Sequence, residues 1–307
     1  MKKRVIHKTV RGNRKINLSG ICKLLIFAAV CQSFGSCVKD DLHNTPHPDK
    51  GAVRVTTDWS GRSSEAFVPG SHTLRIGEES QEVTAETNTF SSLLAPGTYG
   101  LLAYNTPEGI SVSGDTATAD TQDDGTLAPQ PGYLFSATRE LEVAADDTLE
   151  VTLPVQQHIR SLTLTLQLEE GDRERIAGTT ATLTGIAYSL DLTTGKQTAG
   201  QTGRTVAPEF RIGTVTPTRA EGKPALAAML RLMGVVAGER QTLTLSVSLT
   251  DGSVQTLVTD LTGPLKDFGG TMEPLRLDAL LRLPAEGGMG GTITGWKEVD
   301  NGNITIH

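Results

Sequence analysis

The chain has 307 residues, with 28 Lys or Arg against 35 Asp or Glu, so its formal net charge is −7. This acidic balance provides no electrostatic footprint for nucleic acid or for anionic lipid headgroups. Aromatic residues make up only 4% of the chain while Thr, Leu and Val are abundant, which predicts β-rich cores built from aliphatic side chains.

The first 36 residues are predicted to be a lipoprotein signal peptide. Basic residues between Lys2 and Lys23 precede a short apolar run, Leu24–Val30, and Gly35-Ser36 stand directly before Cys37. This is the order of a secretory signal, and the apolar run is much shorter than the roughly 20 residues that span a bilayer. We expect Cys37 to be acylated, for example with palmitate, and to become the first residue; an ordinary signal peptide with a chance cysteine is the alternative.

Cleavage at this point would change both the charge and the cysteine chemistry of the chain. Cys22 and Cys31 would leave with the signal, so that no intramolecular disulfide could form. Eight basic residues would leave too, and 20 Lys or Arg against 35 Asp or Glu give the remaining 271 residues a net charge of −15.

The residues after Cys37 predict a surface location. Lys39, Asp40 and Asp41 resemble the surface-export signal of Bacteroidetes lipoproteins, which implies the outer leaflet of the outer membrane; the start of a polar linker is the alternative reading. Leu42–Gly51 contains two prolines and no apolar periodicity. Residues 37–51 are therefore expected to be a lipidated tether.

Period-two alternation dominates the first half of the chain from Ala52 onward. Because this period places alternate side chains on one face of a sheet, it predicts strands and argues against helices. Pro154 indicates a strand end or an edge. The strands expected in this half cover residues 53–58, 74–76, 99–104 and 149–155.

The second half repeats the alternation. Asp251-Gly252 between two alternating runs predicts a hairpin. Leu226–Val236 could be a buried helix, but Pro224 and Gly234 favour a strand, and Thr262–Phe268 is expected to form one helical turn. The strands expected here cover residues 162–168, 181–192, 226–236, 243–249, 254–258, 275–283, 292–296 and 304–306.

Strands at this spacing predict an all-β fold of two tandem β-sandwich domains. The polar stretch Gln156–Arg160 near the midpoint is expected to hold the boundary. We therefore predict an N-terminal sandwich over residues 52–156 and a C-terminal sandwich over residues 157–307.

No set of residues in the sequence predicts catalysis or a metal site. His43 and His47 have a helical ligand spacing, but Pro46 prevents that helix, so we expect no metal there. The acidic segment Asp115–Asp124 lacks the ligand order of an EF-hand, and a solvated loop is favoured over a calcium site. No nucleophile motif is present, so an enzyme and a bound cofactor are not expected.

Two isolated tryptophans allow two readings. Trp59 and Trp296 both stand at predicted strand ends. An indole ring can fill a hydrophobic core or form a stacking platform for a sugar. We expect both residues to fill cores.

Several short segments together resemble the fimbrillin-associated anchor lipoproteins of Bacteroidetes. The resemblance spans nearly the whole chain after the signal. The segments that carry it are Cys37 with Lys39–Asp41, Pro96–Tyr99, Leu102–Asn105, His158–Arg160, Ile293–Val299 and Ile304–Ile306.

The resemblance implies two transthyretin-like β-sandwiches and a non-enzymatic role in a pilus. Such a protein would be held in the cell outer membrane by its lipid and would contact fimbrial subunits by β-strand addition. Fibre subunits of this type lose an N-terminal strand by cleavage after arginine; Arg54 and Arg62 offer such sites, although an anchor would keep its strand. The segment Asn303–His307 could donate a strand but is expected to complete its own sheet. The alternative function is a glycan- or host-binding surface lipoprotein.

Overall fold

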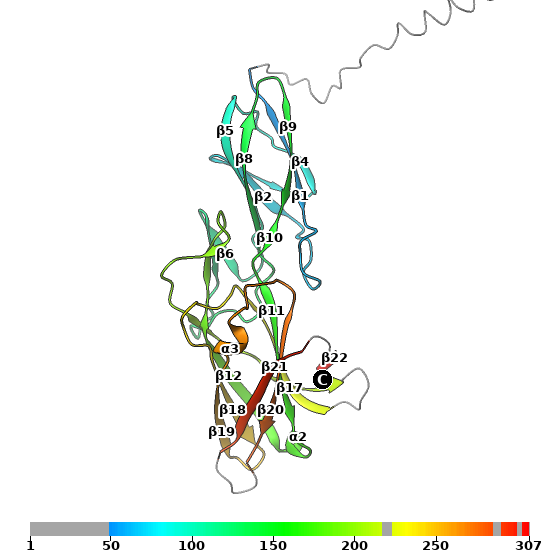
Figure 1. The fold of residues 1–307 in the computed structure, drawn as a ribbon, viewed down its shortest axis with the longest axis vertical. Helices are drawn as coiled ribbons and strands as arrows, with labels where there is room; N and C mark the ends of the chain where they lie inside the picture. The colour runs from blue at the N-terminus through cyan, green and yellow to red at the C-terminus, as the bar shows by residue number, and fades with distance from the viewer. Residues whose placement is uncertain (1–48, 217–222, 285–289, 300–302, 307) are drawn as a thin grey trace, which may run out of the picture. The chain divides into compact units, whose positions relative to one another are not determined.

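The computed structural model describes residues 49–216, 223–284, 290–299 and 303–306 (Figure 1). Within these residues the chain folds almost entirely into β-strands, and its only helices are the single turns α2 (Asp172–Arg175) and α3 (Thr262–Leu265). The all-β fold class predicted from the alternation is confirmed, and α3 is the helical turn expected after Thr262.

A smaller hydrophobic core lies between a three-stranded and a five-stranded sheet. The strands are β1 (Ala52–Asp58), β2 (His72–Ile76), β3 (Glu79–Val83), β4 (Thr87–Thr89), β5 (Gly97–Tyr104), β8 (Phe135–Val143), β9 (Thr148–Pro154) and β10 (Gln156–Gln157). Their order is β4-β1-β9 in one sheet and β10-β8-β5-β2-β3 in the other. Alternate side chains such as Val53, Leu74 and Leu153 fill the space between the sheets, as the period-two pattern predicted.

A larger core collects side chains from a six-stranded and a four-stranded sheet, which form the second sandwich. The strands are β11 (Arg160–Leu168), β12 (Ile176–Ile186), β15 (Arg204–Val206), β16 (Arg211–Thr216), β17 (Lys223–Leu232), β18 (Thr242–Leu249), β19 (Val254–Asp260), β20 (Leu275–Arg282), β21 (Thr292–Glu298) and β22 (Asn303–Ile306). Their order is β21-β20-β11-β17-β16-β22 in one sheet and β15-β12-β18-β19 in the other.

A fifth sheet joins the two halves of the sequence. Its strands are β6 (Ile110–Ser113), β7 (Thr116–Ala119), β13 (Ser189–Asp191) and β14 (Lys196–Gln197). The β6–β7 hairpin pairs antiparallel with β13, and Ile110, Ala117 and Leu127 enter the larger core. Segments from both sides of residue 156 therefore share one sheet and one core, and the domain ranges 52–156 and 157–307 stay a prediction.

The sequence signals for hairpins and strands are confirmed where the pattern is local. Ser253 donates its main-chain N–H to the carboxylate of Asp251, and Gly252 takes a φ of +86°, which closes the predicted hairpin between β18 and β19. The segment after Pro224 is the strand β17 and not a helix. Trp59 is buried and packs in the larger core, as expected.

Strand β8 is not predicted by the alternation of the sequence. Only its last residues, such as Leu141 and Val143, alternate clearly, whereas Thr138, Arg139 and Glu140 stand in a row with no buried side chain among them. The strand is held by its long pairing with β5, from Gly97↔Val143 to Tyr104↔Ser136, which is a contact between distant parts of the sequence. Hydrophobic periodicity alone does not contain this information.

Candidate functional site

The predicted lipid-attachment and export residues lie outside the described part of the chain. Cys37, Lys39, Asp40 and Asp41 all precede residue 49, where the description begins, so these assignments stay predictions. His43 and His47 lie in the same segment. What the structure does describe is the point at which this segment enters the fold.

The chain enters directly into the middle of a sheet. Gly51 exchanges two main-chain hydrogen bonds with Leu94, of 2.8 and 2.9 Å, and a Cβ on this glycine would collide with the carbonyl of Ala144. From there β1 pairs in parallel with β9 along its whole length and antiparallel with β4. Val53 and Val55 are 0% exposed. The first strand is therefore an integral part of the smaller core.

Both arginines singled out as cleavage candidates lie on or just after β1. Arg54 is at the middle of the strand, where its guanidinium lies 3.5 Å from the carboxylate of Glu150 and is partly exposed. Arg62 lies in the following loop and donates a 3.2 Å hydrogen bond to the carbonyl of Trp59. A cut after Arg54 would divide β1 itself, whereas a cut after Arg62 would separate the intact strand from the next part of the chain. Cleavage at either site stays a prediction.

The last described strand completes its own sheet, as expected. β22 pairs antiparallel with β16, from Gly213↔Ile306 to Thr216↔Asn303. It is the edge strand of the six-stranded sheet, so only one neighbour holds it. An edge strand leaves one row of main-chain groups unpaired, which is the geometry that strand exchange requires.

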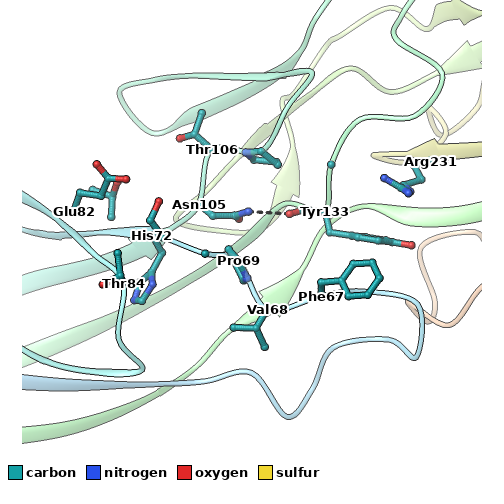
Figure 2. A pocket seen from close by; sticks show the side chains of 15 residues that line it. Phe67, Val68, Pro69, His72, Glu82, Thr84, Asn105, Thr106, Tyr133 and Arg231 are labelled. Atoms are coloured by element: carbon teal, nitrogen blue, oxygen red, sulfur yellow. Dashed lines mark hydrogen bonds between the residues drawn. The ribbon is translucent and has the colours of Figure 1, made fainter.

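A groove of about 950 Å³ opens beside the loop that joins β1 to β2 (Figure 2). Phe67 and Val68 line it with 79% and 49% of their surfaces exposed. Leaving a side chain such as Phe67 in water forgoes about 1.5–3 kcal/mol of burial, so an exposed aromatic residue at a groove marks a candidate contact surface. No sequence pattern indicates this residue, because Phe67 stands in a segment without periodicity.

The two ends of the groove carry opposite charges. Figure 2 shows Arg231, Tyr133 and Phe67 toward one end and Glu82 toward the other. The Arg231 guanidinium lies 4.8 Å from the centroid of the Tyr133 ring and donates a hydrogen bond to the carbonyl of Pro131. Among the described residues it has no carboxylate partner within ion-pair distance. Arg231 belongs to β17, so no local sequence signal links it to Phe67.

The histidine of the groove is a structural residue. His72 is buried, and this burial lowers the pKa of its imidazole below the ordinary value of 6.5. Its ring makes an edge contact with Trp59 at 5.3 Å between centroids, and its Nε2 lies 3.4 Å from the hydroxyl of Thr57. His72 is therefore neutral at neutral pH and anchors the start of β2.

A second buried histidine lies between β8 and a segment of the larger core. The Nε2 of His158 lies 2.8 Å from the hydroxyl of Ser136, and that hydroxyl donates to the carbonyl of Leu192 at 2.7 Å. The hydroxyl of Ser136 donates its only proton to the carbonyl of Leu192. His158 must therefore donate its Nε2 proton to the Ser136 oxygen, and it cannot act as a base for this hydroxyl. Burial lowers the pKa of His158 to about 4. The pair is a structural junction.

Arg160, the last residue of the segment His158–Arg160, also holds the fold together. Its Nε donates to the carbonyl of Glu273 at 2.6 Å and one terminal nitrogen donates to that of Phe268 at 2.7 Å. The guanidinium also lies 5.2 Å from the centroid of the Phe268 ring. Desolvation by burial lowers its pKa, while Glu298 and Glu273 oppose that shift.

The acidic segment does not gather its carboxylates into one place. Asp115 pairs with Arg75, Asp120 accepts a 2.6 Å hydrogen bond from Ser111, and Asp124 accepts from the hydroxyl and main chain of Thr126. The bonds from Thr126 lower the pKa of Asp124. In the part of the chain that the structure describes, no three His, Cys, Asp or Glu side chains are grouped closely enough to hold a metal ion.

Trp296 is only partly buried. It packs against the larger core, and its indole N–H donates a 3.0 Å hydrogen bond to the hydroxyl of Thr259 on β19. The bond joins an edge of one sheet to an edge of the other.

In the described part of the chain, none of the helices has the length and apolar character that a membrane span requires.

Comparison with known proteins adds a family and a fold. The family model described as fimbrillin-A associated anchor proteins Mfa1 and Mfa2 matches residues 73–302. No curated protein sequence matches the chain.

Solved structures with the same fold come from Porphyromonas and Bacteroides. The fimbrial anchor protein Mfa2 from Porphyromonas gingivalis matches with a TM-score of 0.54 and 10% identity, covering 84% of this chain and 99% of that one. A candidate adhesin from Bacteroides ovatus matches at 0.56 and 12%, covering 89% and 99%. A candidate polysaccharide-binding protein from Bacteroides thetaiotaomicron matches at 0.52 and 8%, covering 82% and 99%. At these identities the likeness concerns the fold.

Proposed function

The chain belongs to the family of fimbrillin-A associated anchor proteins, and from this membership we propose that it is an anchor or accessory subunit of a fimbria. In this proposal a lipid on Cys37 holds it to the outer membrane, with Lys39, Asp40 and Asp41 directing it to the cell surface. It acts through contacts with fimbrial subunits and not through catalysis. Its working units are the two sandwiches over residues 52–156 and 157–307.

The observation that carries this proposal is the position of β1. The strand lies between β4 and β9 with Val53 and Val55 fully buried, so the smaller sandwich is completed by the chain's own first strand. A subunit completed in this way needs no strand from a neighbour at this end. That is the property expected of a subunit at the membrane end of a fibre, where the chain before β1 leads back to the lipid.

Lipid attachment supplies enough free energy for a stable anchor if more than one acyl chain is present. Each buried methylene contributes about 0.8 kcal/mol, and a single chain binds only reversibly. A diacylglycerol on the thiol of Cys37 together with an acylated amino group would satisfy this requirement. The residues between Cys37 and Gly51, with prolines at positions 46 and 48, would then separate the fold from the membrane.

At the other end of the chain, β22 is the strand proposed to meet the next subunit. It is short and lies at a sheet edge. Release of β22 from β16 would offer an extended segment to a neighbouring sheet and would free the edge of β16 at the same time. Main-chain hydrogen bonds would provide most of the affinity in either arrangement.

The anchor is tested by replacing one cysteine at a time. Cys37→Ala should abolish palmitate labelling and move the protein from the membrane to a soluble fraction, whereas the matched variant Cys31→Ala, inside the signal, should change neither. Membrane retention of Cys37→Ala would refute the lipid tether. Replacing Lys39, Asp40 and Asp41 with alanine should keep the protein in the membrane but protect it from protease added outside the cell.

The fibre contact is tested separately from the anchor. The wild-type chain should be found with sheared fimbriae, and a chain ending at Gly302, which lacks β22, should stay in the membrane but lose this association. Fimbriae that retain the truncated chain would exclude β22 as the contact. If the wild-type chain never associates with fimbriae, the fimbrial role itself is wrong.

A second candidate function is a surface module that binds glycans. The exposed ring of Phe67 beside the groove favours it, since aromatic side chains stack on sugars. One structure with the same fold is named as a candidate polysaccharide-binding protein. Glycan affinity gels separate the two functions: a shift that disappears in Phe67→Ala would favour the binding module.

A further inference from the structure

The main chain of the loop between β1 and β2 has an unpaired stretch next to the groove. Residues Phe67–Ser71 make no main-chain hydrogen bond to any other described residue. The stretch leads straight into β2, which begins at His72. Val68 precedes Pro69, and a residue before proline favours extended backbone. The loop therefore presents free main-chain donors and acceptors.

Both strands that neighbour β2 end beside its first residues, so neither reaches back along Phe67–Ser71. β3 ends at Val83, which pairs with His72, and β5 ends at Tyr104, which pairs with Thr73. The chains that continue from them, through Thr84 and through Asn105, form walls of the groove. Phe67–Ser71 therefore precedes the paired part of β2, and no described strand pairs with it.

The side chains around this space leave specific groups available. Phe67 is 79% exposed, and Arg231 holds a charge without a described carboxylate partner. In contrast, two buried polar side chains of the groove already bond within the fold. Asn105 donates to the carbonyl of Tyr133 and accepts from the N–H of Phe135, and the hydroxyl of Tyr133 bonds that of Ser161. The side chains of Asn105 and Tyr133 therefore hold the wall of the groove in place.

We propose that this groove binds an extended polypeptide segment of a partner, which pairs with the main chain of Phe67–Ser71. An apolar side chain of that segment packs on Phe67 and Val68, and a neighbouring carboxylate binds Arg231. Strand addition supplies the main-chain hydrogen bonds. The side chains of Phe67 and Val68 and the guanidinium of Arg231 select which side chains the partner segment carries. The site lies outside the tether and outside β22, so it does not depend on the proposed anchoring role.

The test uses random linear peptides displayed on phage and selected on the purified full chain. Peptides that are enriched should contain a bulky apolar residue close to Asp or Glu. Their affinity should fall at least about tenfold in Phe67→Asp and in Arg231→Gln. Val258→Asp is the matched control, because Val258 is 66% exposed on β19 and does not line the groove. It should leave binding unchanged.

Hydrogen exchange locates the contact on the main chain. A bound peptide should slow exchange of the amides of Val68, Gly70 and Ser71 about tenfold or more, while Pro69 has no amide to report. Because Phe67 is exposed, Phe67→Asp should keep the melting temperature, which separates lost binding from lost folding. The proposal would be overturned if no peptide were enriched, if both groove variants bound the peptides as tightly as the wild-type chain, or if protection appeared elsewhere in the chain. Groove-dependent binding of glycans alone would overturn it as well.

Discussion

The first and last described strands differ in how firmly the fold holds them. β1 has a neighbour on each side and two fully buried valines, whereas β22 has one neighbour and lies at a sheet edge. Removing an internal strand would sacrifice two rows of hydrogen bonds and part of a core, but removing an edge strand sacrifices one row. The N-terminal end is therefore structural, and the C-terminal end can be exchanged at lower cost.

The largest effect on stability is expected from a charge placed at a buried position of β1. Val55→Asp should lower the free energy of unfolding by about 4 kcal/mol or more, because an unpaired carboxylate would enter the smaller core. Thr56→Asp introduces the same charge at the next position, whose side chain is partly exposed and bonds the hydroxyl of Thr87. It should cost about 1 kcal/mol. Denaturant unfolding measures both, and equal losses would contradict the internal role of β1.

The burial of His158 should make the stability of the fold depend on pH. His158 has a folded pKa of about 4 against an ordinary value of 6.5, so the unfolded chain binds more protons between these values. Stability should therefore be full above pH 6.5 and fall by about 3 kcal/mol as the pH drops to 4 and below.

His158→Gln supplies the control for this pH dependence, since its amide does not titrate but can still bond Ser136. The part of the slope between pH 6.5 and 4 that comes from His158 should disappear in the variant. Probes placed in each sandwich, followed during acid unfolding, also tell whether the two cores unfold together. A wild-type slope identical to that of the variant would refute the assignment.

The contact between β19 and β21 is an intermediate case between a buried strand and a free edge. Trp296→Phe should cost about 1 kcal/mol through loss of the bond from the indole N–H to Thr259. Thr259→Val should lower the free energy of unfolding by a similar amount. The double variant should lose less than the sum of the two single losses, because both changes remove the same hydrogen bond. Strictly additive losses, measured by chemical denaturation, would show that the bond does not stabilise the fold.

The smallest effect on stability is expected from removing β22. A chain ending at Gly302 should unfold with a free energy within about 1 kcal/mol of the full chain, because only the pairing with β16 is lost. The amides of Gly213–Thr216 that face β22 should exchange faster. A loss as large as that of Val55→Asp would erase the difference between the two ends and would argue against strand exchange at the C-terminus.

The alternation of residues was sufficient to predict those elements whose burial follows a local rule. Leu243–Leu249 and Val254–Val258 around Asp251-Gly252 became the hairpin of β18 and β19, and Leu162–Leu168 became β11. In contrast, β8 and the β6–β7 hairpin were missed. β8 is held by pairing with β5 and β7 by pairing with β13, and these contacts join segments that are far apart in the sequence.

Local sequence patterns are enough to predict the all-β class, most of the strands and the family resemblance, because side-chain period and turn chemistry act over a few neighbouring residues. The three-dimensional fold is needed to show that β1 is internal, that β22 is an edge, and that Phe67 and Arg231 line one groove. These features join residues far apart in the chain, and their positions follow from sheet order and core packing, which no local pattern specifies.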